Sequence, residues 1–572
     1  MKRQSGPRRH ALASASCWAL CLGSAAVHAM PLDIDSEDWS IRWDNTAKLS
    51  AKLRTEAADP ALSASTRELV PGVPASAFPQ ALNFNAGDQN FQKKGLVSER
   101  ADLLSEFDAV WQNRFGIRLS GAAWYDAKLH QHTQADNDSS IGQTPYDRFP
   151  AYTQRMSGGN AELLDAFVFG SWQLGDESKL NARLGRHALQ YGESLFFGDN
   201  GIARAQGPVD IDKLLASPNA QFKEVIRPVP QLSAQWQINP SVSLGGYVQF
   251  RWEADRLPPS GSYFSSANIP WGSEQPEFVG ISDSSTGTLL TSYQLSADGN
   301  HNPRANGQFG LQLKWRLDET DLGFYYTRYH DKDGQLYGEL AAPPGAAATG
   351  GGRWYYRFGD DINVVGASFS TSLGDFNVAG EASVRNNMPL HTTSNYLYGF
   401  YPGQAEPAFQ TGRTAHLNLS TLATFGPNVL AEESALVAEV AWNRVLHTED
   451  FANLQATGRT RDASIAQFVY TPSYRQVLPG LDLSVPLGLR YSLSGKSAVT
   501  AWDAKGNGTL TLGVSGNYVN AWQFAMTYSH YLGKAVPVTD YSPALTSGAP
   551  IFGDGNALAD RDHIALSLQR SF

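Results

Sequence analysis

Apolar and polar side chains alternate along many short segments of this chain, and this periodicity constrains its fold more than any other feature. Between residues 241 and 251 the even positions hold Val, Leu, Gly, Val and Phe, whereas the odd positions hold Ser, Ser, Gly, Tyr, Gln and Arg. Successive side chains of a strand point to opposite faces, so such a segment has one apolar face and one polar face. A tilted strand of about 10 residues crosses the hydrocarbon core of a membrane, and these segments have that length.

Eighteen segments follow this pattern, and the connections between them fall into two classes. Short turns such as residues 113–115 and 239–240 alternate without exception with long connections such as 56–100 and 254–306. Bacterial outer-membrane barrels have an even number of strands, short periplasmic turns and long extracellular loops. The sequence therefore predicts an all-β fold, a transmembrane antiparallel up-and-down β-barrel of 16–18 strands with long extracellular loops. The candidate strands start near residues 39, 101, 115, 161, 178, 231, 241, 307, 321, 360, 375, 413, 434, 463, 484, 508, 521 and 561.

The composition agrees with a membrane barrel. Charged residues make up 17% of the chain and aromatic residues 11%, and there are 53 glycines, a profile that arises when apolar residues occupy every second position. The alternatives are a soluble β-sandwich and a secreted solenoid, but a sandwich has an aliphatic inner face and turns of similar length. Here the polar face carries repeated charges, and the apolar face ends in tryptophans, as aromatic girdles do: Trp39, Trp43, Trp111, Trp236, Trp315, Trp442 and Trp522.

The first 29 residues have the organisation of a secretory signal peptide. Basic residues precede an apolar stretch over residues 11–27, and Val27-His28-Ala29 resembles a cleavage site, so we predict cleavage after Ala29. Residues 30–572 then form a single barrel domain in the cell outer membrane. Both cysteines of the chain lie in the signal, which excludes disulfides and thiolate chemistry in the mature protein. Loss of four basic residues lowers the net charge from −10 to −14, so nucleic acid is not an expected partner.

The connection over residues 183–230 differs from the other long connections. It combines glycine turns with apolar groups such as Leu195-Phe196-Phe197, and an exposed loop has little reason to carry this much apolar surface. We therefore predict that it folds into the barrel as a lumenal plug or constriction, with a short helix over residues 211–216 capped by Asp210 or Asp212. Its charges are expected to pair with lumenal partners such as Arg183 and Arg251. The predicted substrate or constriction residues are Arg183, Arg186, Tyr191, Gly192, Glu193, Phe196, Asp210, Lys223, Glu224 and Arg251.

The last ten residues belong to the final candidate strand, and this alternating strand ends on Phe572. Ile564, Leu566 and Leu568 share the parity of Phe572. A terminal amphipathic strand of this kind resembles the signal read by the outer-membrane barrel assembly machinery. Phe572 is therefore the predicted assembly signal, and that machinery is an expected partner.

Two stretches of the mature chain carry a family resemblance. One is the opening strand with Trp39-Ser40-Ile41-Arg42-Trp43, and the other runs from Gly185-Arg186-His187 through Tyr191-Gly192-Glu193-Ser194, Pro208-Val209-Asp210 and Lys223-Glu224 to Pro228-Val229-Pro230. In these stretches the chain resembles a proteobacterial family known as domain of unknown function 1302, although Gln190-Tyr191 stands where the family usually has Asn-Trp. The resemblance implies an outer-membrane barrel linked to hydrophobic compounds, often alongside large inner-membrane lipid transporters. It implies no known substrate.

No set of residues predicts catalysis or metal binding. His416, Asn418 and Ser420 share a strand face in a spacing that loosely resembles an outer-membrane phospholipase, but residues two apart lie about 7 Å apart, too far for a Ser–His hydrogen bond. Residues 331–334, Asp-Lys-Asp-Gly, resemble the start of a calcium loop, but Ala342 stands where a carboxylate is required, so a plain extracellular turn is expected. We predict no enzyme activity, no cofactor and no metal.

These patterns together predict an outer-membrane channel or transporter for small hydrophobic or amphipathic molecules, such as lipids or steroid-like compounds. Two alternatives stay open: an outer-membrane partner of an inner-membrane lipid transporter with little pore activity of its own, and an outer-membrane hydrolase. The expected partners are outer-membrane lipid, the barrel assembly machinery and a small-molecule substrate, with an inner-membrane lipid transporter in the first alternative.

Overall fold

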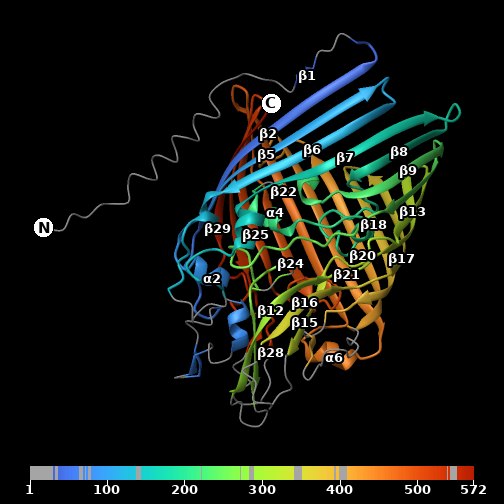
Figure 1. Cartoon of the computed structure of the whole chain (residues 1–572). Coiled ribbons are helices and arrows are strands. Elements are labelled where there is room, and N and C mark those ends of the chain that lie inside the picture. The colour runs from blue at the N-terminus through green and yellow to red at the C-terminus, as the bar shows by residue number, and fades with distance from the viewer. Residues whose placement is uncertain are drawn as a thin grey trace.

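The chain forms a closed β-barrel in the computed structural model (Figure 1), which describes residues 30–32, 36–62, 68–70, 73–74, 79–84, 86–136, 143–218, 220, 222–268, 270, 272–282, 289–340, 351–391, 395–397, 409–537, 539–540 and 551–572. The sheet closes because the last strand, β29 (His563–Ser571), pairs with β2 (Trp39–Arg54). Two short strands, β23 (Leu481–Ser484) and β24 (Leu487–Ser494), share one position between β22 and β25. The wall of the barrel therefore has 18 strand positions, all antiparallel to their neighbours.

The other wall strands follow each other around the ring in chain order. They are β5 (Gly95–Trp111), β6 (Phe115–Asp126), β7 (Gly159–Gln173), β8 (Lys179–His187), β9 (Val229–Asn239), β10 (Val242–Gln249), β13 (Gln308–Leu317), β14 (Thr320–Tyr329), β17 (Ile362–Leu373), β18 (Phe376–Pro389), β20 (Thr411–Phe425), β21 (Glu433–Thr448), β22 (Asp462–Leu478), β25 (Gly508–Tyr518) and β26 (Trp522–Leu532). A further strand, β1 (Met30–Leu32), pairs with β2 beyond the point where β29 ends.

The observed strands confirm the predicted barrel, and their number is the upper limit of the predicted range of 16–18. One connection is a correction: residues 471–483 were expected to form a turn, whereas β22 continues to Leu478 and the chain reverses at Pro479-Gly480. The proline at position 472 favours the end of a strand, yet Pro472 lies within β22, where its carbonyl accepts the Val485 amide at 2.9 Å. Proline lacks only the donor of a ladder hydrogen bond, so a strand tolerates it beside an irregularity such as the β23–β24 interruption.

The predicted apolar parity faces outward. Leu311, Val365 and Leu419 expose 58%, 62% and 51% of their surface, whereas the alternate positions of the same strands face the interior. Tryptophans mark the outer surface at the short-turn end, as expected for side chains at a membrane interface. The exposed ones are Trp39, Trp43, Trp111, Trp172, Trp236 and Trp315.

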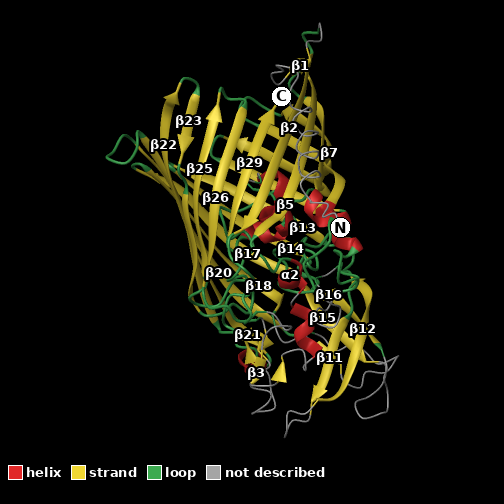
Figure 2. Ribbon diagram, turned by 90° about the vertical axis from the view of Figure 1, so that its left-hand side faces the viewer, coloured by secondary structure: helices red, strands yellow, loops and turns green. Residues whose placement is uncertain are grey.

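The long connections build a second layer of structure at the opposite end of the barrel (Figure 2). Its five-stranded sheet consists of β11 (Glu277–Ser282), β12 (Leu289–His301), β16 (Gly352–Phe358), β15 (Gly334–Leu340) and β19 (Asn395–Leu397). The pairs β3 (Glu68–Val70) with β4 (Val73–Pro74) and β27 (Thr539–Asp540) with β28 (Ile551–Phe552) are smaller sheets. The helices are α2 (Ala86–Asn90), α3 (Ala151–Thr153), α4 (Ile211–Ala216), α5 (Phe222–Val225) and α6 (Phe451–Ala456). Within the described residues, no helix has the length and apolarity of a membrane span.

The closing seam places the predicted assembly signal. Asn45 and Phe572 exchange two backbone hydrogen bonds of 2.8 Å, so the terminal residue joins the first strand to the last. Arg570, the one charge on the outward parity of β29, lies over the ring of Trp522 at 5.0 Å from the ring centre.

Candidate functional site

The described residues of the connection between β8 and β9 (188–218, 220 and 222–228) contact the inner wall of the barrel through both halves of the connection; we refer to residues 188–228 as the inner segment. Its described residues include the 3-10 turn Ile202–Ala205 and the helices α4 and α5. Its length of chain far exceeds what a connection between adjacent strands needs. The candidate site is built from this segment and the side chains that hold it.

Two buried carboxylates on the inner wall bind the first half of the segment through its backbone. Glu381 on β18 accepts the amides of Glu193 at 2.7 Å and Ile202 at 3.0 Å. Glu439 on β21 accepts the amides of Leu195 at 3.1 Å and Phe197 at 3.0 Å, and it also accepts the amide of Phe196. Charge-assisted hydrogen bonds of this kind are stronger than neutral ones, so these carboxylates fix the path of the chain.

The carbonyl groups of the same stretch bind a positively charged arginine on the wall. Arg385 on β18 is 1% exposed, and its guanidinium donates to the carbonyls of Asn200 at 2.6 Å and Gly201 at 2.9 Å. Gly192 has a φ of +91°, and a Cβ atom there would collide with the Glu381 carboxylate. The glycine is therefore required both by the backbone conformation and by the close approach of the carboxylate.

Asn200 is fully buried and connects the segment to a polar network on β20 and β21. Its amide nitrogen donates to Asn418 Oδ1 at 2.8 Å, and its Oδ1 lies 2.9 Å from His416 Nδ1 and accepts from Asn443 at 3.1 Å. Ser420 donates to the carbonyl of Glu193 at 3.4 Å. The three residues whose spacing loosely resembled a phospholipase thus all contact the inner segment.

The second half of the segment binds the first strands of the barrel. Asp210 caps α4 by accepting the Lys213 amide at 2.8 Å, which confirms the predicted helix and its cap. The other carboxylate oxygen of Asp210 pairs with Arg256 at 2.5 Å. Lys48 on β2 lies 3.7 Å from Glu224, and its neighbour Lys52 donates to the carbonyl of Leu215. Arg256 in turn pairs with Glu162 on β7 at 2.9 Å.

These two sets of anchors lie on opposite sides of the ring. The first set comes from β18, β20 and β21, and the second from β2 and β7. In a ring of 18 positions, β7 and β21 are nine positions apart, so the two sets face each other across the lumen. A single stretch of about 40 residues is therefore bound to both walls.

Arg204 lies at the middle of the segment and is held by three carboxylates. Its guanidinium, 6% exposed, lies 2.5 Å from Asp255, 2.9 Å from Asp331 and 3.3 Å from Asp333. Burial opposes the charge on Arg204, but the three carboxylates outweigh this effect and raise its pKa. Residues 331–333 form the bend between β14 and β15, in line with the expected turn, but Asp331 is 2% exposed and ion-paired, so the turn is not a plain one. These residues are a buried ion-pairing site because the inner segment covers them.

Aromatic rings pack around the start of the segment. Tyr191 lies 5.5 Å from the ring of Tyr247 on β10 and 6.0 Å from that of Tyr325 on β14, and all three are buried. Glu193, beside them, lies 3.9 Å from Lys314 on β13. Further along the segment, Phe197 packs against Trp502 with ring centres 5.8 Å apart, and Phe196 contacts the same cluster.

Burial also perturbs a carboxyl group of α4. Asp212 is 7% exposed and accepts a hydrogen bond from Ser157 at 2.6 Å. Burial, followed by repulsion from Asp210, raises the pKa of Asp212 to about 6. This carboxyl group therefore changes its charge within a range of pH that an outer membrane meets.

Only some of the predicted site residues take part in the contacts that hold the inner segment. Arg183 and Arg251 are exposed, and within the described part of the chain neither forms an ion pair, so the expected pairing of segment charges with them is wrong. Arg256, Lys48 and Lys314 take those carboxylates instead. Arg186 pairs with Glu253 at 2.7 Å, outside the segment, and Lys223 lies in α5 with a side chain outside the described residues.

Sequence reasoning missed the strongest contacts. Arg204, Arg385 and the two carboxylates Glu381 and Glu439 carry no motif, and their partners lie far away in the chain. The available signal was a charge at an inward position of a strand, which Glu381, Arg385 and Glu439 all show. In the part of the chain that the structure describes, no three His, Cys, Asp or Glu residues group closely enough to hold a metal ion.

Sequence comparison assigns the family. The family model described as "Protein of unknown function (DUF1302)" matches residues 9–572. The chain belongs to this family. The resemblance found in the opening strand and the inner segment of this DUF1302 protein is thus confirmed over nearly its whole length. No curated protein matches the sequence.

Solved structures are similar to this DUF1302 protein at low identity. OccAB1 of Acinetobacter baumannii is 10% identical, with 95% of this chain and 99% of that chain covered and a TM-score of 0.42. The outer membrane channel DcaP of Acinetobacter baumannii is 9% identical, with coverage of 94% and 99% and a TM-score of 0.33. OccK2 (OpdF) of Pseudomonas aeruginosa, in complex with glucuronate, is 10% identical, with coverage of 93% and 98% and a TM-score of 0.37. At TM-scores below 0.5, these likenesses carry no conclusion about this DUF1302 protein.

Proposed function

We propose that this protein is an outer-membrane channel for small molecules, exported with a signal peptide cleaved after Ala29, and that the inner segment gates its lumen. The carrying observation is one segment held by opposite walls of the ring, through Glu381 and Glu439 on one side and Lys48 on the other. A barrel of 18 strands encloses a water-filled channel unless a part of the chain fills it. A segment bound across such a lumen limits what passes.

The nature of the anchors favours a gate over a permanent plug. Most of them are hydrogen bonds and ion pairs, which water replaces when the segment moves away. Apolar contacts are confined to small clusters such as Phe197 with Trp502 and Tyr191 with Tyr247 and Tyr325. Because the anchors sit on separate strands, the segment can leave without any change in the barrel wall.

The substrates are, in this proposal, small hydrophobic or amphipathic molecules. Tyr247 and Tyr325 on the wall support this choice, because each presents an apolar ring and a hydroxyl group to the lumen when the segment, with Tyr191, leaves. An aromatic surface of this kind binds the apolar part of a solute while its polar part stays hydrated.

The proposal is tested by removing the segment. Residues 195–222 are replaced by a short Gly/Ser linker, so that the strands and the two flanking anchors at Glu193 and Glu224 stay in the chain. The purified barrel is reconstituted into planar bilayers, and we expect a single-channel conductance several-fold above that of the native protein. Heat-modifiable migration of unboiled samples checks that the barrel has folded.

A matched replacement controls for the disturbance of a long connection. Residues 341–350, a stretch rich in Gly, Ala and Pro outside the described residues, receive the same linker. We expect the native conductance in this variant. If the first replacement folds and conducts like the native protein, the inner segment does not limit the lumen and the gating function is refuted.

A partnership with an inner-membrane lipid transporter is a second candidate, favoured by the turns at the short-turn end. Val429, Leu430, Leu478 and Val519 expose 103%, 66%, 62% and 55% of their surface there, on the side that faces the periplasm in outer-membrane barrels. Copurification of such a transporter with the native barrel, and its loss when Val429 and Leu430 become serine, would support this candidate; no copurification would exclude it.

A further inference from the structure

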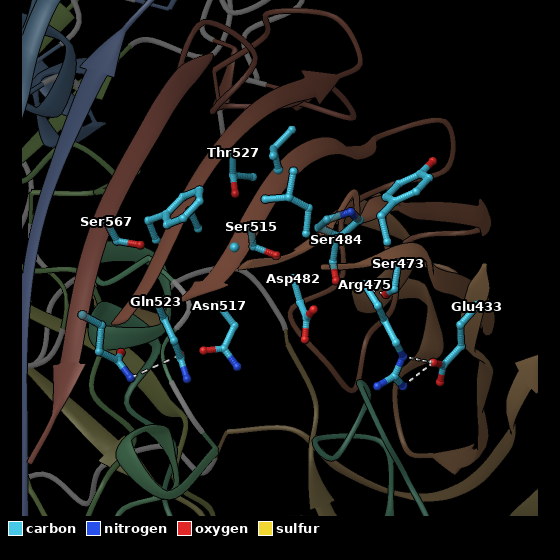
Figure 3. Close-up of a pocket in the computed structure, with 18 residues that line it drawn as sticks. Glu433, Ser473, Arg475, Asp482, Ser484, Ser515, Asn517, Gln523, Thr527 and Ser567 are labelled. Carbon is cyan, nitrogen blue, oxygen red and sulfur yellow. Dashed lines mark hydrogen bonds and ion pairs between the residues drawn. The ribbon is translucent and has the colours of Figure 1, made fainter. Parts of the chain in front are cut away.

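A recess of about 510 Å³ opens in the wall formed by β22, β23, β25, β26 and β29, at the short-turn end of the lumen (Figure 3). Its lining includes the hydroxyl groups of Ser515, Thr527 and Ser567. These side chains lie on the inner face, because their strand neighbours Val514 and Met526 expose 43% and 51% of their surface on the outer face. The recess is therefore part of the path between the inner segment and the periplasmic mouth.

Small side chains make the wall concave here. Across three neighbouring strands, one row consists of Ser515, Ala525 and Ser567, and the next consists of Gly513, Thr527 and Ala565. Large residues at these positions would fill the space, whereas serine, alanine and glycine leave it open. The hollow thus follows from the register of the strands and the choice of residues at inward positions.

Three rows of inward residues on β25, β26 and β29 offer hydrogen-bonding groups and contain no charged side chain. In the part of the chain that the structure describes, the hydroxyls of Ser515, Thr527 and Ser567 form no side-chain hydrogen bond, so they are available to a ligand. The row nearest the turn adds the amides of Asn517, Gln523 and Gln569.

The charged residues that line the recess lie on β21, β22 and β23, outside these three rows. Glu433 and Arg475 pair with each other at 2.5 Å, and Asp482 accepts the backbone amide of Gln476 at 2.8 Å. The inner wall is different at β5 to β7, where Arg118 lies within 3.5 Å of Glu106, Asp108 and Asp165.

We propose that this recess binds the uncharged polar part of the transported molecule, a part that carries hydroxyl or amide groups. Neutral donors and acceptors replace the water around a hydroxyl group, but they do not repay the cost of stripping water from an ion. A ligand with a carboxylate or an ammonium group in this position is therefore disfavoured. The inference rests on the proposed channel function and names the substrate class that this function serves.

The test compares three probes of equal size that differ in charge: galactose, galactosamine and galacturonate. In the barrel with residues 195–222 replaced by the linker, each sugar is titrated while the ion current through single channels is recorded. We expect galactose to reduce the current in a saturable manner, with an affinity at least about tenfold above those of the two charged sugars. Equal or stronger block by a charged sugar would overturn the proposal.

A triple variant, Ser515→Ala with Thr527→Val and Ser567→Ala, removes the three free hydroxyls with little change in volume. We expect its affinity for galactose to fall about tenfold or more, because several hydrogen bonds to the ligand are lost together. Ser370→Ala with Ser372→Ala, which removes inward hydroxyls from β17 at the same end of the barrel, serves as the matched control and leaves the affinity unchanged. An unchanged affinity in the triple variant would assign the binding to another part of the lumen.

A measurement that does not depend on gating separates the two proposals. Saturation-transfer NMR of galactose with the detergent-solubilised native barrel detects weak binding even if the linker variant does not conduct. Signals that weaken in the triple variant but not in the β17 control support the recess whatever the conductance shows. Signals that are absent, or equal in both variants, refute the recess even if the inner segment proves to be a gate.

Discussion

Replacing Arg204 by glutamine removes the charge that joins the middle of the inner segment to the extracellular connections. The native guanidinium is 6% exposed and lies within 3.3 Å of Asp255, Asp331 and Asp333, of which the first two are 2% and 3% exposed. Loss of one partner from a buried ion pair costs about 3–5 kcal/mol, because the remaining charge is left buried and unpaired. The released segment exposes these carboxylates to water, so the whole cost falls on the docked state.

The expected size of the effect follows from this free energy. Each 1.4 kcal/mol corresponds to a factor of ten, so the ratio of released to docked segment rises roughly 10²- to 10³-fold. In single-channel recordings this appears as a much higher open probability at an unchanged open-state conductance. Arg204→Lys restores the charge but not the planar fork and should give an intermediate value.

A control variant removes an arginine that does not touch the segment. Arg444 and Asp462 are 45% and 39% exposed and lie 3.2 Å apart, and exposed pairs contribute about 0–1 kcal/mol. Arg444→Gln should therefore leave the open probability unchanged. If Arg204→Gln assembles normally, as judged by heat-modifiable migration, and opens no more often than the native channel, Arg204 does not hold the segment in place.

Three further changes probe other parts of the molecule. Glu439→Ala frees three backbone amides of the segment and should raise the open probability at least about tenfold, since even one hydrogen bond to a charged group contributes about 1.5–3 kcal/mol net; an unchanged value would contradict the anchoring role. In the docked state, burial and Asp210 raise the pKa of Asp212 to about 6, so docking takes up a proton and strengthens as the pH falls from about 6 towards the ordinary pKa of 3.8. The open probability should therefore fall with acidification. Asp212→Asn should flatten this part of the pH profile. Deletion of Phe572 removes the two backbone hydrogen bonds to Asn45 at the seam and the proposed assembly signal. The amount of heat-modifiable barrel in outer membranes should therefore drop sharply. Normal amounts would show that the assembly machinery recognises another feature of the chain.

The barrel could be predicted from the sequence because its determinants are local. The alternation around Phe524 or Leu566 is a property of neighbouring residues, and each strand pairs with the next one along the chain. The inward path of residues 188–228 was also predictable, since Phe196 and Phe197 would be exposed on an outer loop. Such features need no knowledge of distant partners.

The partners of the inner segment could not be predicted in this way. Arg204 pairs with Asp331, 127 residues further on, and the choice depends on how the extracellular connections fold over the lumen. Arg183 and Arg251 looked equally suitable as partners for Asp210, yet Arg256 takes this carboxylate because its backbone lies beside Asp210 in an isolated bridge. A pattern along one strand shows which side chains face inward but not which point of the lumen a loop reaches.

The separation between the inner segment and its anchors sets an order for biogenesis. Glu193 reaches Glu381 across 188 positions of the chain, and Leu195 reaches Glu439 across 244. The segment has neither carboxylate to bind until β18 and β21 have been synthesised and have joined the wall. Docking of residues 188–228 is therefore a late step of folding, which follows the meeting of strands from both halves of the chain in one wall.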